Sequence, residues 1–366
     1  MIFSKKIIAG VLSLCMAGAV VPAANVFSPA EAAAQTEEQP EVVVQGDFAY
    51  AKYSGHAELI GHTKIGEKLE SEIKLPDKID GVPLTVIKSG LFANRDEIVS
   101  VKLPDTITYI GENAFAGCTN LSSVNMPRDL EATGAYAFAG CKKLRSVSIP
   151  LGVKVIYEGV FASSGLTSIK IPDGVEEIAY GAFTGCKDLT SVNIPASVTR
   201  IGNLAFLQCF NLSSITIENP DCSIYDSMFT ITSYDSTGFE GSGYDLEKYL
   251  EDNDIKAFTG TIYGYEGSTA QEYADKYGYK FVDINDKCLG DVNQDGAVNA
   301  LDASMVLTAY ASNAVGKGYG LTDAQKSSAD VNKDGTVDAL DASKILEYYA
   351  YTATGGTGSL VDFLNK

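Results

Sequence analysis

The sequence predicts an α/β-type repeat solenoid of short strands, followed by a small all-α domain. Three observations support this prediction. A unit of about 23 residues recurs through the middle of the chain, as in proteins built from stacked repeats. Two acidic twelve-residue segments, 291–302 and 330–341, lie 39 residues apart and share the continuation ALDAS. An apolar pattern with helical spacing follows each segment, which predicts two helices.

The N-terminus has the composition of a secretory signal peptide. Lys5 and Lys6 precede an apolar run, and Ala30-Glu31-Ala32 provides small residues for cleavage after Ala32. Residues 1–32 are therefore expected to be removed, and the mature protein is expected to be secreted; a retained membrane anchor is the alternative. No later stretch is long and apolar enough to cross a bilayer, so no membrane span is expected in the mature chain.

The 366-residue chain carries a formal charge of −19. Removal of residues 1–32 takes away two lysines and one glutamate, which leaves −20. An acidic surface repels phosphate backbones, so nucleic acid is not an expected partner.

Residues 33–45 are polar and are expected to form a disordered leader. From Phe48 the sequence alternates around a glycine turn, which predicts a capping hairpin. The repeats follow within a domain that we place at residues 46–282. Their units begin at Ile98, Leu121, Leu144, Leu166, Leu189 and Leu212.

Each unit contains a short strand with the pattern L-x-x-V-x-I, in which Val124 and Met126, or Ile169 and Ile171, are expected to point inward. A proline then ends the strand because it has no N–H to donate. A later I-x-x-x-A-F segment supplies a second apolar row. Single units cannot bury these faces alone, so they are expected to stack. The phenylalanines that mark the row are Phe92, Phe115, Phe138, Phe161, Phe183, Phe206 and Phe229.

The consensus resembles bacterial leucine-rich repeats of the BspA-like type. That resemblance implies a binding or surface-display module with no common enzymatic activity. Strand positions that point outward would face a protein or glycan partner, whose identity the sequence does not give. One outward column is Ser100, Ser123, Ser146, Ser168, Ser191 and Ser214, and the other is Lys102, Asn125, Ser148, Lys170, Asn193 and Thr216.

Four cysteines share one phase of the repeat, three residues after the phenylalanine. A column of small buried residues is the structural interpretation. Disulfides between neighbouring coils are the alternative in a secreted protein. Ser164 interrupts the column of Cys118, Cys141, Cys186 and Cys209.

After Phe229 the period fades. A helix is expected near 246–251, and residues 261–284 predict strand, turn, helix and strand, with Ser268 as N-cap and Gly278 as the helix stop. We interpret this segment as the C-terminal cap of the solenoid. Residues 225–279 contain nine tyrosines, for which capping is favoured over stacking on sugar rings.

The two acidic segments have the spacing of calcium loops. Oxygen-bearing side chains occupy positions 1, 3, 5, 9 and 12, a carbonyl is available at 7, and a glycine at 6 allows the sharp turn. We therefore expect two Ca²⁺ ions. The expected ligands are Asp291, Asn293, Asp295, Ala297, Asn299 and Asp302, and Asp330, Asn332, Asp334, Thr336, Asp338 and Asp341.

Position 12 is Asp rather than Glu, and residues 283–288 are expected to be a linker rather than a helix. Short helices are expected at 300–311 and 339–350. In both departures from the helix–loop–helix motif, residues 289–366 resemble a type I dockerin. The resemblance implies Ca²⁺-dependent binding to a cohesin module of a scaffoldin in a cellulosome. It also implies that loop positions 10 and 11 contribute to recognition of the cohesin.

The helix faces that follow the loops are the expected cohesin-binding surface. Val306 with Tyr310, and Ile345 with Tyr349, are expected to pack between the helices. A further helix is expected from Thr322, and the tail is expected to fold back through Leu360 and Phe363. The expected contact residues are Ala300, Leu301, Ser304, Met305 and Thr308, and Ala339, Leu340, Ser343, Lys344 and Glu347.

Catalytic motifs are absent from the sequence. Ser71–Lys74 fits S-x-x-K but lies where a strand begins, and His56 and His62 belong to the N-terminal cap. With the signal peptide, the resemblance to dockerins then implies a secreted, non-catalytic cellulosome component attached at the cell surface. The alternatives are a cell-surface adhesin, or an accessory protein of plant polysaccharide degradation with weak hydrolase activity.

Overall fold

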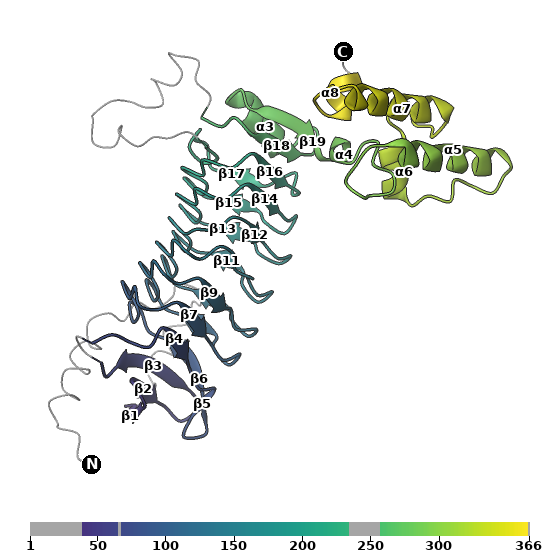
Figure 1. Ribbon diagram of the computed structural model, residues 1–366. Helices are drawn as coiled ribbons and strands as arrows, with labels where there is room; N and C mark the ends of the chain where they lie inside the picture. The colour runs from purple at the N-terminus through teal and green to yellow at the C-terminus, as the bar shows by residue number, and fades with distance from the viewer. Residues whose placement is uncertain (1–38, 65–66, 234–256, 365–366) are drawn as a thin grey trace, which may run out of the picture. The chain divides into compact units, whose positions relative to one another are not determined.

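Figure 1 shows the computed structural model of the chain, which describes residues 39–64, 67–233 and 257–364. The signal peptide and the helix expected near 246–251 lie outside these ranges. The described residues form two compact units, one within residues 1–215 and 221–260 and the other within residues 216–220 and 261–366. Among the helices described, none combines the length and apolarity that a bilayer crossing requires.

The N-terminal cap is an antiparallel meander of β1 (Glu41–Gln45), β2 (Phe48–Lys52) and β3 (Ala57–His62). The hairpin predicted from Phe48 is confirmed. The expectation of a disordered leader is wrong for residues 41–45, because β1 pairs with all of β2 and Glu41 forms a 2.6 Å ion pair with Lys52.

The repeats are confirmed as a solenoid, in which the described coils contribute very short parallel strands and, within the described residues 67–233, no helix (Figure 1). Sheet order runs from β3 through β6 and β8 to β10, and a second sheet joins β11, β13, β15 and β17. The other row consists of β4, β7 and β9, then β12, β14 and β16. The bounds in the first row are β6 Val82–Ile87, β8 Tyr109–Ile110, β10 Ala132–Thr133, β11 Val155–Ile156, β13 Glu177–Ile178, β15 Arg200–Ile201 and β17 Ser223–Ile224. The short β5 (Lys78–Ile79) pairs antiparallel with β6. Those in the second row are β4 Glu72–Lys74, β7 Ser100–Lys102, β9 Ser123–Asn125, β12 Ile169–Lys170, β14 Ser191–Ile194 and β16 Ser214–Ile217.

A column of stacked phenylalanine rings runs through the core of the coils. Ring centroids of successive members lie 5.0–6.0 Å apart, with interplanar angles of 6–17°. The buried rings supply each coil with a large apolar surface that only the next coil can cover. The column comprises Phe92, Phe115, Phe138, Phe161, Phe183 and Phe206.

The cysteine column lies beside these rings as free thiols. The thiol of Cys118 donates to the carbonyl of Phe92 at 3.0 Å, and Cys141 repeats the contact with Phe115 at 3.3 Å. Burial raises the pKa of the Cys118 and Cys186 thiols to about 11. Each thiol therefore serves as a compact buried donor between coils, as the structural interpretation predicted.

The outward columns are exposed over most of their length, with one correction. Thr216 is buried, because residues 216–220 pack with the C-terminal cap, where the amide of Thr269 donates to the carbonyl of Pro220. Asn125 is exposed, but its side-chain amide donates to the carbonyl of Leu103 at 2.7 Å and accepts from the amide of Leu103 at 2.8 Å. The asparagine thus links two coils.

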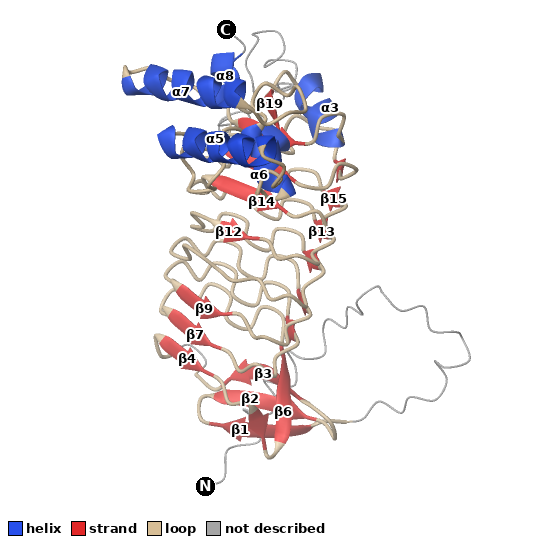
Figure 2. Cartoon of the chain, turned by 90° about the vertical axis from the view of Figure 1, so that its right-hand side faces the viewer, coloured by secondary structure: helices blue, strands red, loops and turns tan. Residues whose placement is uncertain are grey.

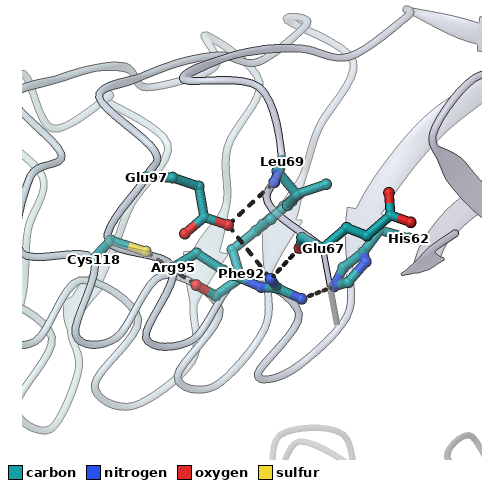
Figure 3. Close-up of polar contacts among 7 residues, drawn as sticks. All are labelled: His62, Glu67, Leu69, Phe92, Arg95, Glu97 and Cys118. Atoms are coloured by element: carbon teal, nitrogen blue, oxygen red, sulfur yellow. Dashed lines mark hydrogen bonds and ion pairs between the residues drawn. The ribbon is translucent and has the colours of Figure 1, made fainter. Parts of the chain in front are cut away.

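Figure 3 shows how the first coil is joined to the N-terminal cap through Arg95. Its guanidinium lies 2.8 Å from Nε2 of His62 and 3.0 Å from the carbonyl of Glu67. Glu97 accepts from the amide of Leu69 and pairs with Arg95 at 3.4 Å. Burial, followed by the charge of Arg95, lowers the pKa of His62. His62 is thus a packed residue of the cap.

The C-terminal cap consists of β18 (Thr261–Gly264), α3 (Thr269–Lys276) and β19 (Lys280–Asp283). The predicted signals are confirmed: Ser268 accepts from the amide of Gln271, and Gly278 follows the helix with a φ of 66°. Tyr273 and Tyr279 are both 6 % exposed, so these two rings serve to close the core.

Candidate calcium loops and the helix face

The C-terminal helices pack around a small apolar core. Val292, Val306, Val331 and Ile345 are at most 2 % exposed, and α5 packs against α7 (Figure 2). The residues expected to form a linker contain a short helix, which Asp283 caps by accepting from the amide of Asn285 at 2.9 Å. The helices are α4 Ile284–Lys287, α5 Ala300–Ala314, α6 Asp323–Ala329, α7 Ala339–Ala353 and α8 Leu360–Leu364.

The first acidic segment forms a tight loop whose side chains bond to their own backbone. The carboxylate of Asp291 accepts from the amides of Asp295 at 3.1 Å and Gly296 at 2.9 Å. Asn293 accepts from the amide of Asp295 at 2.9 Å. Gly296 has a φ of 89° with open space around a notional Cβ, so the backbone conformation and not crowding requires the glycine.

The second segment repeats this network. Asp330 accepts from the amides of Asp334 at 3.1 Å and Gly335 at 2.9 Å, and Asn332 accepts from Asp334 at 3.0 Å. Positions 4 and 6 are left-handed in both loops, at Gln294 and Lys333 as well as at the glycines. Two segments 39 residues apart therefore adopt one conformation.

Position 12 connects each loop to its helix. Asp302 is fully buried and accepts from the amides of Val292, Asn293 and Asn299 at 2.9–3.0 Å. With N-cap Asn299 it completes a capping box at the start of α5. Asp338 and Asp341 form the same box on α7. The shorter aspartate at position 12 thus has a structural role in addition to its predicted role as a ligand.

The predicted ligand sets fit a hard cation by their chemistry. All twelve predicted donors are carboxylate, amide or backbone oxygens, which Ca²⁺ prefers. Asp302 and Asp341 are 0 % exposed, and neither has an ion-pair partner in the described part of the chain. Burial raises the pKa of Asp341, as expected for a carboxylate without a nearby cation. Within the described residues, however, no three His, Cys, Asp or Glu side chains converge as a metal cluster, because the carboxylates turn onto backbone amides.

The predicted contact residues lie along α5 and α7. Leu301 is 64 % exposed and Leu340 is 52 % exposed, whereas Met305 and Lys344 are half-buried. The other six are exposed: Ala300, Ser304, Thr308, Ala339, Ser343 and Glu347.

One predicted packing arrangement is wrong in part. Val306 and Ile345 are fully buried between the helices, but Tyr310 and Tyr349 are 43 % and 44 % exposed. Each tyrosine lies four residues after the buried residue. Four residues are slightly more than one helical turn, so the tyrosine is rotated away from the narrow interface between the two helices. The tyrosines therefore belong to the surface.

Two further surface residues were missed by sequence reasoning. Leu307 is 44 % exposed and Leu346 is 42 % exposed, and they occupy the same place in α5 and α7. The sequence did contain a signal for this pair, because Leu307 and Leu346 are 39 residues apart, the same separation as the two loops. Leu301, Leu307 and Tyr310 thus match Leu340, Leu346 and Tyr349.

The tail folds back onto the start of the domain, as predicted. Leu360 is 3 % exposed, and one of its methyl carbons would lie 2.5 Å from a Cβ at Gly290. Phe363 packs against the rings of Tyr348 and Tyr351 at 5.8 and 5.3 Å. The helix α6 predicted from Thr322 is also present, with Thr322 as its N-cap.

Comparison with known protein families agrees with both halves of this architecture. The family model described as "BspA type Leucine rich repeat region (6 copies)" matches residues 68–186 and 154–253, about half of the chain. The chain belongs to the BspA-type leucine-rich repeat family. Residues 289–348 of this BspA-type protein match the "Dockerin type I domain". Both families are non-catalytic, and type I dockerins typically bind calcium and serve cohesin binding in cellulosome-type assemblies.

Solved structures similar to this BspA-type chain are bacterial leucine-rich repeat proteins. A leucine-rich cell surface protein from Faecalibacterium prausnitzii is 31 % identical over 49 % of this chain, with a TM-score of 0.41. The match spans 55 % of that protein's chain, so this chain corresponds to about half of its length. A leucine-rich repeat protein from T. pallidum is 25 % identical over 57 % of this chain and 93 % of its own, with a TM-score of 0.45. No curated protein matches the chain significantly.

Proposed function

We propose that this protein is a secreted, non-catalytic component of a cellulosome-type assembly. Its C-terminal helices bind a cohesin module of a scaffoldin in a Ca²⁺-dependent way, and its leucine-rich repeats present a binding surface for another molecule. Under this proposal the scaffoldin holds the protein at the cell surface. The hydrolase alternative has no support from the described residues, whereas the adhesin alternative differs only in what the helices attach to.

The observation that carries the proposal is the duplicated site. Two loops with the same hydrogen-bond network each lead into a helix whose second residue is an exposed leucine, Leu301 in one and Leu340 in the other. The loop carboxylates, together with buried Asp302 and Asp341, concentrate negative charge that a bound cation would offset. We propose one Ca²⁺ ion in each loop, held by the twelve predicted ligands.

Binding energy in such an interface concentrates in a few buried side chains. Leu301 and Leu340 are the most exposed large apolar side chains of their helices and are the best candidates. The predicted contact faces of α5 and α7 are not identical, because Lys344 and Glu347 replace Met305 and Thr308. We therefore propose that the two orientations related by the duplication bind one cohesin with unequal affinity.

Pull-down of the full-length protein with a panel of cohesin modules, with and without EDTA, tests the proposal. We expect capture by at least one cohesin, loss of capture in EDTA, and recovery with excess Ca²⁺. Leu301→Ala/Leu340→Ala should weaken capture by about 2 kcal/mol or more. Leu151→Ala is the matched control, since Leu151 is 74 % exposed in the solenoid. Attachment to cells without any cohesin interaction would instead favour the adhesin.

A further inference from the structure

A row of tyrosines and glutamates crosses four coils on the side of the solenoid that carries β8, β10, β11 and β13. The outward strand columns contain no aromatic residue, so the exposed aromatic rings of the repeats lie elsewhere, and this row groups several of them. Tyr157 is 39 % exposed and Tyr180 is 46 % exposed. We call the row the tyrosine–glutamate strip and define it as Tyr109, Glu112, Tyr136, Tyr157, Glu158 and Tyr180.

Backbone pairing between coils places these residues beside one another. The amide of Tyr136 donates to the carbonyl of Glu158 at 2.8 Å, and the amide of Gly159 donates to the carbonyl of Tyr180 at 3.0 Å. Tyr109 and Glu112 lie on the preceding coil, where β8 pairs with β10. The strip is therefore continuous across the four coils.

Side-chain contacts hold part of the strip in place. The hydroxyl of Tyr136 donates to Glu158 at 2.7 Å, and this bond raises the pKa of Tyr136 to about 12. The ring lies directly over Gly159, where a Cβ would come within 2.1 Å of a ring carbon. Gly159 is thus required for the ring to lie flat against the backbone. A surface ordered before binding loses less conformational entropy when a partner docks.

The carboxylates of the strip are not neutralised by the protein. Neighbouring basic groups are already paired, Lys154 with Glu176 at 3.4 Å and Arg200 with Glu177 at 3.0 Å. Glu112, Glu158 and the adjacent Glu131 are exposed, and none has an ion-pair partner within residues 67–233. The strip therefore carries two uncompensated negative charges, Glu112 and Glu158, and Glu158 contacts the ring hydroxyl of Tyr136.

We propose that the tyrosine–glutamate strip docks a cationic segment of a partner protein, one that carries arginine or lysine. Arginine stacks on aromatic rings and pairs with carboxylates through the same planar group. Tyrosine is enriched at interface positions that contribute most of the binding energy. The net charge of −19 would attract such a segment from a distance. This inference rests on the proposed role of the repeats as a binding module and specifies the partner of that module.

The test uses the full-length protein and a fluorescein-labelled eight-residue peptide of alternating arginine and glycine, followed by fluorescence anisotropy. We expect Tyr157→Ala/Tyr180→Ala and Glu112→Gln/Glu158→Gln each to weaken binding about tenfold. Asp129→Asn/Asp173→Asn removes the same charge from exposed carboxylates outside the strip and should change binding less than about twofold. Unchanged unfolding midpoints would show that all three variants fold.

Equal weakening of peptide binding by the Asp129/Asp173 control would overturn the proposal, because it would show that binding depends on net charge alone. Unchanged peptide binding by the strip variants would also overturn it. Displacement of the peptide by cellohexaose or xylohexaose, with the tyrosine variant impaired and the glutamine variant intact, would also overturn it in favour of a glycan. The strip variants should retain full cohesin capture. Failure of that capture in every variant and in the wild type would instead refute the proposed function.

Discussion

At the level of single residues, the repeat depends on two left-handed positions in each coil. Asn113, Tyr136 and Leu204 occupy the first with φ of 55–57°, and glycines occupy it in other coils. Gly117, Gly140 and Gly185 occupy the second at 71°, where Ser163 and Gln208 adopt 56°. A left-handed conformation costs a residue with a Cβ about 1–2 kcal/mol. The non-glycine coils therefore store local strain.

Ser163→Gly should stabilise the protein by about 0.5–1 kcal/mol, since relief of the strain exceeds the added entropy of glycine in the unfolded chain. Urea unfolding of the full-length protein would measure the change. Ser168→Gly is the matched control, because Ser168 is also exposed but has no positive φ, and it should destabilise. Destabilisation by Ser163→Gly would show that the coil does not carry this strain.

The cysteine column makes a second prediction at this scale. Burial raises the pKa of the Cys118 thiol to about 11 and that of Cys222 to about 12, so both stay protonated at pH 8. Ellman's reagent at pH 8 should therefore titrate the exposed Cys288 in the folded mature protein, and all six cysteines after unfolding in urea. A disulfide-linked peptide containing Cys118 and Cys141 in a non-reducing digest would contradict this prediction.

At the level of elements, the loops and helices of the C-terminal half depend on one another. Asp302 and Asp341 close their loops and cap α5 and α7 with the same carboxylates. The short α8 completes the core with one buried side chain, Leu360. An element of five residues has little stability of its own, so its position depends on that contact.

Leu360→Ala should destabilise the C-terminal helices by about 2 kcal/mol or more, because a buried leucine loses its contacts and leaves a cavity. Thermal unfolding in excess Ca²⁺ would measure the loss. Leu346→Ala provides the control, since Leu346 is 42 % exposed and its truncation should change stability little. Equal effects of the two substitutions would mean that α8 does not depend on this contact.

At the level of the whole molecule, the chain combines two sources of stability. The solenoid is held by stacking of apolar side chains and by inter-coil hydrogen bonds, which need no ion. The C-terminal helices surround two acidic loops and bury two carboxylates. Under the proposed function, a cation that binds only the folded loops adds its binding energy to folding.

EDTA should therefore lower or abolish the unfolding transition of the C-terminal helices and leave that of the repeats unchanged. At free Ca²⁺ of about 100 times the dissociation constant, one site contributes about 2.7 kcal/mol. Differential scanning calorimetry of the full-length protein, with Ca²⁺ added back after chelation, would measure the shift. A trace that does not respond to EDTA would refute the calcium sites, and Asp338→Asn should reduce the shift without removing the helix cap.

The period, the stacking and the paired loops could be predicted from the sequence, because each depends on a local spacing of residues that repeats. A proline after each strand, a phenylalanine in every coil and a glycine at loop position 6 need no distant partner to be recognised. Which side chains are exposed to solvent could be read only from the three-dimensional fold. In the structure, Tyr310 and Tyr349 lie outside the interface between the helices, Thr216 is buried, and residues 41–45 form a strand. Tyrosines from four coils also came together on one side. Exposure depends on what packs against a residue from elsewhere in the chain, and local spacing does not contain that information.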